Sequence, residues 1–111
     1  MKETTTHHVS ALLNQYAWWQ GKSDNVLAGL VDMTIYGTYI GDKISDEARL
    51  TLKDIALRYV ATEMMAIRCD LRDLGVTFHD GGDTVDELCN LLCALYGQKI
   101  ADAAEAKAKG G

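Results

Sequence analysis

Three cysteines and one histidine are the residues of this chain best suited to bind a metal ion. Cys89 and Cys93 are four residues apart, so on a helix they project from adjacent turns. Cys69 and His79 would complete a tetrahedral, thiolate-rich set of ligands. Zinc fingers and ribbons hold such a cysteine pair in a turn, however, and cysteine also packs well as a small buried group on a helix. We therefore predict no metal and no cofactor, and keep this set as the alternative.

A run of acidic residues lies in the segment HDGGDTVDE, which begins at His79. It contains Asp80, Asp83, Asp86 and Glu87, a density of carboxylates that could hold a divalent cation. The order does not match a calcium-binding loop, which alternates its oxygen ligands and closes with a glutamate at position twelve. Acids in the first turn of a helix are explained by the helix dipole alone.

The segment DELCN, which ends at Asn90, resembles the metal-binding helix of the all-helical nucleotide pyrophosphohydrolases. That resemblance implies a metal-dependent, nucleotide-processing enzyme. The family has Asp where Asn90 stands, and it needs two spaced glutamates on a second helix, where this chain offers only Glu63. The sequence also lacks a nucleophile elbow, a phosphate-binding loop and a Ser-Lys motif. We predict no catalytic residue; an enzyme using Glu63, Asp70, Asp83 and Glu87 is the alternative.

The element that must position most of these groups is a long helix from Ser45 to Gly75. Ser45 is a preferred N-cap residue, and Asp46 and Glu47 place negative charge in the first turn. Gly75 supplies the usual C-terminal stop, and no Gly or Pro interrupts the positions between. At about 1.5 Å per residue this helix is roughly 45 Å long. A small domain cannot cover that length with its other helices, so we expect a homodimer.

The apolar residues of this long helix do not form one straight stripe. At about 100° per residue, the stripe of the C-terminal half is rotated by roughly a quarter turn from that of the N-terminal half. We therefore expect the two halves to face different neighbours. The N-terminal stripe contains Ala48, Leu52, Ile55, Ala56 and Tyr59, and the C-terminal stripe contains Val60, Met64, Ile67, Leu71 and Leu74.

Three further helices are expected, over residues 9–20, 26–40 and 85–106. Gly21 ends the first, and Thr84 with Glu87 forms a capping box before the last. The segment from Thr34 to Ile40 is rich in β-branched and aromatic residues, so a strand is possible there, although strict alternation is absent. The fold class is therefore all-α, a small four-helix bundle-like domain. It spans residues 1–111, with frayed ends at 1–7 and 107–111.

Three acids and one aromatic residue occupy unusual positions on these helices. Asp32, Glu63 and Asp70 lie beside apolar residues, so we expect them to be partly buried, with Arg58 or Arg68 as possible ion-pair partners for the last two. Trp18 falls on the face of the first helix opposite its apolar stripe. An exposed Trp there is either a partner-binding residue or a side chain that lies across a neighbouring segment.

Composition narrows the function. The net charge of −5 disfavours direct nucleic-acid binding, and with it a helical DNA-binding regulator, which is the third alternative. The N-terminal MKETTTHHVS lacks the apolar region of a secretory signal, and the number of cysteines is odd. No stretch of about 18 apolar residues exists, so no membrane span is expected. We therefore expect a cytoplasmic protein.

These observations predict a small acidic protein that inhibits, adapts or regulates another protein without catalysis. Accessory inhibitors of the phage type have this size and character, a class-level comparison that no residue motif carries. Acidic side chains would suit a basic groove on the partner. The expected partner-binding residues are Trp18, Asp42, Asp46, Glu47, Asp80, Asp83, Asp86 and Glu87.

Overall fold

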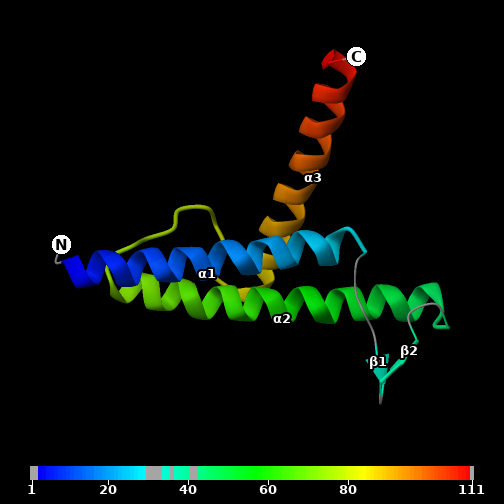
Figure 1. Cartoon of the computed structure of the whole chain (residues 1–111), viewed down its shortest axis with the longest axis horizontal. Coiled ribbons are helices and arrows are strands. Elements are labelled where there is room, and N and C mark those ends of the chain that lie inside the picture. Colours follow the sequence, from blue (N-terminus) through cyan, green and yellow to red (C-terminus); the bar gives the residue numbers. More distant parts are fainter. Residues whose placement is uncertain (1–2, 30–33, 36, 41–42, 111) are drawn as a thin grey trace.

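The computed structural model describes residues 3–29, 34–35, 37–40 and 43–110. Within these ranges the chain forms three long helices and a hairpin of two very short strands (Figure 1). The elements in chain order are α1 (Glu3–Leu27), β1 (Thr34–Ile35), β2 (Thr38–Tyr39), α2 (Asp46–Asp73) and α3 (Val85–Gly110). The predicted all-α class is confirmed.

The helices α1 and α2 lie side by side in opposite directions, and α3 leaves this pair at a steep angle (Figure 1). The molecule is consequently flat, with extents of 52 × 46 × 23 Å. The C-terminal part of α3 extends away from the pair, and every residue from Gly97 to Gly110 is exposed. An ion pair of 2.6 Å between Lys99 Nζ and Asp24 Oδ2 joins α3 to α1.

The ends of α2 follow the predicted signals. Ser45 is the N-cap, and its Oγ accepts a hydrogen bond from the backbone N–H of Ala48 at 3.1 Å. At the other end, the N–H of Val76 donates to the Leu71 carbonyl at 2.9 Å, as in a Schellman motif. Gly75 has a φ of 91°, a left-handed conformation that glycine adopts without strain. The start of α3 is capped as predicted, because Thr84 Oγ1 accepts from the Glu87 N–H at 3.1 Å.

The first helix is longer than predicted. Gly21 does not end it, and α1 continues to Leu27. Ser23, two residues further on, is fully buried inside α1, where its Oγ donates to the Gln20 carbonyl at 2.7 Å. A serine that hydrogen-bonds to its own preceding turn is compatible with a helix interior.

The predicted helix over 26–40 is wrong in the described part of that segment. The chain turns at Gly29, whose φ is 87°, and Thr34–Ile35 pairs antiparallel with Thr38–Tyr39. Gly37, with a φ of 79°, lies between the two strands. The β-branched and aromatic content of this segment therefore prevailed over its helical spacing. The described residues contain three helices rather than the expected four.

The core lies where the three helices meet. Met64 of α2 and Leu88 of α3 are completely buried, together with neighbours such as Val26 of α1. A second cluster lies towards the other end of the helix pair and joins Leu12 and Leu71 to the loop residue Phe78. Over the described residues, no helix combines the length and apolar character needed to span a bilayer.

Candidate protein-interaction surface

The thiolate metal site that the sequence left as an alternative is not assembled. Cys69 and Cys93 are exposed, Cys89 is buried, and all three are free thiols. Burial raises the pKa of the Cys89 thiol. His79 Nε2 lies 3.2 Å from Thr77 Oγ1, beside its own loop. Among the described residues, no three side chains of His, Cys, Asp or Glu lie close enough together to hold a metal ion.

The acidic loop before α3 is instead bound to a buried arginine. Arg68 of α2 is only 2% exposed, and its guanidinium makes a two-pronged contact with Asp80 at 2.9 and 2.7 Å. Arg68 Nε donates to the Tyr16 hydroxyl at 2.8 Å, and Nη1 also donates to the Gly82 carbonyl at 3.2 Å. The guanidinium carbon lies 4.2 Å from the centroid of the Phe78 ring, a cation–π contact. This network holds the loop against α1 and α2.

The electrostatics of this network explain how the charges are tolerated. The hydrogen bonds from Arg68 hold the pKa of Asp80 at about 2, although partial burial opposes this. Burial alone would lower the pKa of Arg68, but its hydrogen bonds to Asp80 and Tyr16 raise it above its ordinary value. Burial raises the pKa of Tyr16, so its hydroxyl stays protonated. The predicted contact residue Asp80 therefore has a structural partner within the chain.

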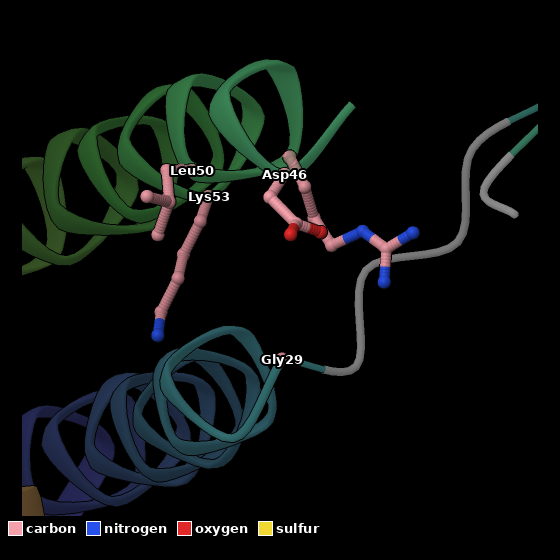
Figure 2. A pocket seen from close by; sticks show the side chains of 5 residues that line it. Gly29, Asp46, Leu50 and Lys53 are labelled. Atoms are coloured by element: carbon pink, nitrogen blue, oxygen red, sulfur yellow. The ribbon is translucent and has the colours of Figure 1, made fainter. Parts of the chain in front are cut away.

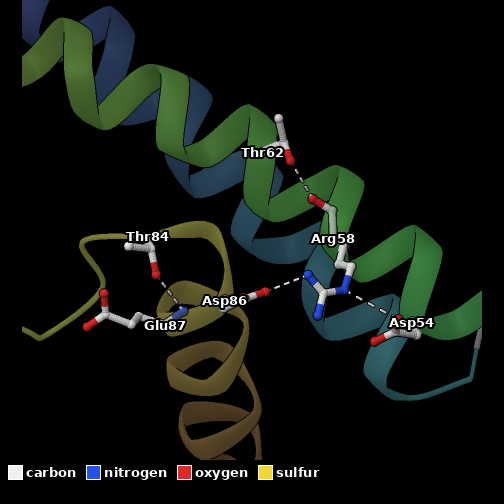
Figure 3. A network of polar contacts seen from close by, with 6 residues as sticks. All are labelled: Asp54, Arg58, Thr62, Thr84, Asp86 and Glu87. Carbon is white, nitrogen blue, oxygen red and sulfur yellow. Dashed lines mark hydrogen bonds and ion pairs between the residues drawn. The ribbon is translucent and has the colours of Figure 1, made fainter.

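A second acid of the predicted contact set is also tied to α2. Arg58 donates from Nη1 to Asp86 of α3 and contacts Asp54 one turn before it on α2 (Figure 3). The hydrogen bond with Asp86 is the main reason that the pKa of Arg58 is raised. In the part of the chain that the structure describes, the exposed carboxylates of Asp83 and Glu87 have no side-chain partner. Two of the four acids of this run, Asp80 and Asp86, thus form ion pairs within the chain.

The remaining predicted acids do not form a cluster. Glu63 is half-buried as expected, whereas Asp70 is exposed, because α2 turns it away from the core. Asp46 and Glu47 are exposed in the first turn of α2. The four carboxylates of the alternative enzyme site include no set of three that could bind a metal. Asp32 and Asp42 lie outside the described residues.

A cavity of about 270 Å³ lies between the end of α1 and the start of α2 (Figure 2). The described residues that line it are Gly29, Asp46, Arg49, Leu50 and Lys53. This described lining offers two cations and one carboxylate, and it contains no thiol, hydroxyl or imidazole.

The clearest candidate for an interaction surface is the uncovered side of α2. The C-terminal stripe is buried, with Met64 and Leu71 inaccessible. In the N-terminal stripe, by contrast, Ile55 is 58% exposed and Tyr59 is 59% exposed. The two halves of the helix therefore have different surroundings, as the rotation of the apolar residues indicates.

Aromatic side chains of α1 extend this uncovered side. Trp18 is 57% exposed, in agreement with its predicted position opposite the core. Its ring contacts Trp19 edge-on at 4.9 Å between centroids, and Trp19 contacts Tyr59 in the same way at 5.8 Å. Lys22 lies over the Trp18 ring at 4.9 Å. We call the group formed by Trp18, Trp19, Lys22, Ile55 and Tyr59 the aromatic surface.

The sequence contained part of the signal for this surface. Trp18 was singled out by its helical position, and Ile55 and Tyr59 by their stripe. That these residues form one surface was not predictable, because it depends on how α1 is aligned along α2.

Comparison of the chain with protein-family models, with curated proteins and with solved structures finds no match.

Proposed function

We propose that this chain is a non-enzymatic protein-interaction module that acts in the cytoplasm as an inhibitor, adaptor or regulator. The observation that supports this proposal is the aromatic surface, where three large apolar side chains on two adjacent helices are each more than half exposed. Contiguous apolar surface of this kind is costly to leave in water, and it marks binding sites in stable proteins.

The chemistry of the aromatic surface suits protein recognition. Trp and Tyr are the residues most enriched at the centres of protein interfaces, because they bury a large area and lose little conformational freedom. A single positive side chain, Lys22, lies over Trp18.

The test is capture of binding proteins from a lysate of the host with tagged wild-type protein and the Trp18→Ala variant. We expect Trp18→Ala to reduce capture at least about tenfold, since an interface Trp contributes upwards of about 2 kcal/mol. The melting temperature should change little, because Trp18 is largely exposed. The matched control is Leu13→Ala, an exposed residue of the same helix outside the aromatic surface. Equal capture by all three proteins would refute the proposal.

A further inference from the structure

A second pattern runs along the outer side of α2 through Ile55 and Tyr59. Residues spaced alternately by four and three positions fall within one strip of the helix, opposite the buried Leu57, Met64 and Leu71 at about 100° per residue. Two members are half-buried and the other five are exposed. We call this strip the outer stripe; it consists of Ala48, Leu52, Ile55, Tyr59, Thr62, Ala66 and Cys69.

The spacing of the outer stripe is that of a coiled-coil seam. Alternating steps of four and three give the 3.5-residue period with which one helix packs along another. The buried side of α2 already contacts α1 and α3. In the described part of the chain no third helix lies on the outer stripe, which is therefore a seam without its partner helix.

The outer stripe is complementary to itself. Its larger side chains, Leu52, Ile55 and Tyr59, lie in the N-terminal half, and its smaller ones, Thr62, Ala66 and Cys69, lie in the C-terminal half. Antiparallel pairing of two copies places a large side chain against a small one in each of the three layers that these six residues form. Parallel pairing would place large against large at one end and leave voids at the other, which is costly.

The layers of the antiparallel pair follow from this register. Tyr59 meets Thr62 of the partner subunit, Ile55 meets Ala66 of the partner subunit, and Leu52 meets Cys69 of the partner subunit. The two-fold axis then passes between Val60 and Ala61. Isologous contacts of this type are the commonest in homodimers.

The position of Trp18 also fits this arrangement. The aromatic contact between Trp19 and Tyr59 places Trp18 level with the middle of the stripe. The two copies of Trp18 consequently approach one another near the two-fold axis.

The available area is sufficient for a dimer. The outer stripe extends over 21 residues of α2, a length of about 32 Å. Because α1 lies beside α2 and each helix is about 10 Å wide, the side formed by both helices has an area of roughly 600 Å² per subunit. Stable interfaces begin at about 600 Å² per partner. Face-to-face pairing of two α1/α2 units in this way would create a four-helix bundle with the two α3 helices outside it.

We infer that a second copy of this chain covers the outer stripe in antiparallel orientation, with Trp18 at the two-fold axis. This inference rests on the proposed function, because it names the partner of the same surface. A monomer that still captures another protein through Trp18 would overturn the inference and leave the proposed function standing.

The first test is the solution mass, measured by sedimentation equilibrium from 1 to 100 µM, on the order of the concentrations at which such interfaces assemble. We expect the wild type to be a dimer at the upper end. Ile55→Asp should raise the dimer dissociation constant more than about tenfold. The control is Ile100→Asp on α3, where the native side chain is equally exposed, at 54% against 58%. A monomeric wild type, or equal effects of the two variants, overturns the inference.

The second test addresses orientation and register by oxidative cross-linking in a Cys93→Ser background. Leu52→Cys should form a covalent dimer through native Cys69 of the partner subunit, since both lie in one layer. Within one chain the two positions are about 25 Å apart along the helix, too far for a disulfide. Leu50→Cys, at the same height on the opposite side of α2, is the control and should remain uncross-linked. A Cys69–Cys69 dimer in the background protein would show parallel pairing and overturn the arrangement.

Discussion

At the scale of single residues, the stability of the loop before α3 depends on one buried guanidinium. Arg68 directs four N–H donors to Tyr16, Asp80 and Gly82 and lies against the Phe78 ring. Burying a charge is expensive, and these partners offset the cost only as a set. Loss of one partner therefore leaves an unsatisfied buried cation.

The first residue-scale prediction concerns Asp80→Asn. The neutral amide cannot maintain the charged two-pronged contact with Arg68. The free energy of unfolding at pH 7 should therefore fall by about 1–2 kcal/mol. This expected loss is kept small because Asp80 is partly exposed, and solvent weakens its ion pair. Chemical denaturation measures this difference. Asp83→Asn, which alters an exposed acid three residues away, should leave the free energy unchanged within about 0.5 kcal/mol.

The same pair makes a prediction about pH. The pKa of Asp80 is about 2 in the folded chain, and that of an unfolded aspartate is about 3.9. Because the folded pKa is the lower one, its contribution is fully present above about pH 4 and is lost as the pH falls towards 2. The stability difference between wild type and Asp80→Asn should therefore shrink across this window. A constant difference from pH 7 to pH 2.5 would contradict the assigned pKa.

At the scale of elements, local signals predicted the helix ends well. The caps at Ser45 and Thr84 and the stop at Gly75 each depend on hydrogen bonds within a few residues, which a sequence encodes directly. The segment 26–40 was predicted wrongly because its helical spacing and its β-branched content disagree. Two strands of two residues each are too short for an alternating pattern to show whether a helix or a hairpin forms.

Contacts between elements were the least predictable. The pairing of Arg68 with Asp80 spans a helix end and a loop, and the acidic run suggested a surface feature instead. The difference between the two halves of α2 was predictable, because the positions of its apolar residues in the sequence show that the stripe rotates. Which face is buried was decided by the positions of α1 and α3, which no local pattern specifies.

The docking of the loop onto α3 gives a prediction at this scale. An added Cβ at Gly82 would lie 3.3 Å from Arg68 Nη1 and from Leu88 Cδ1, which is closer than comfortable packing. Gly82→Ala should therefore destabilise the protein by about 1 kcal/mol or more. Gly97→Ala provides the control, because Gly97 lies in α3 with open space around it, and should stabilise the helix by about 0.5–1 kcal/mol. Thermal unfolding of both variants tests the sign; stabilisation by Gly82→Ala would contradict the packing of the loop.

At the scale of the whole molecule, the flat arrangement explains why an apolar side stays uncovered. The steeply inclined α3 covers one side of the α1/α2 pair only in part, and the outer stripe and aromatic surface remain open. Association of two copies, as inferred above, would bury this side of the α1/α2 pair.

The most direct measurement of that association is tryptophan fluorescence of the wild-type protein as a function of its concentration. Both tryptophans of the chain belong to the aromatic surface, with Trp18 exposed and Trp19 half-buried against the core, so a change of emission with protein concentration reports on this surface. Dilution through the dissociation constant should shift the emission maximum to longer wavelength and increase quenching by acrylamide, and Ile55→Asp should show the diluted spectrum at every concentration. An emission maximum and a quenching constant that stay the same at all concentrations, and equal in both proteins, would contradict the account.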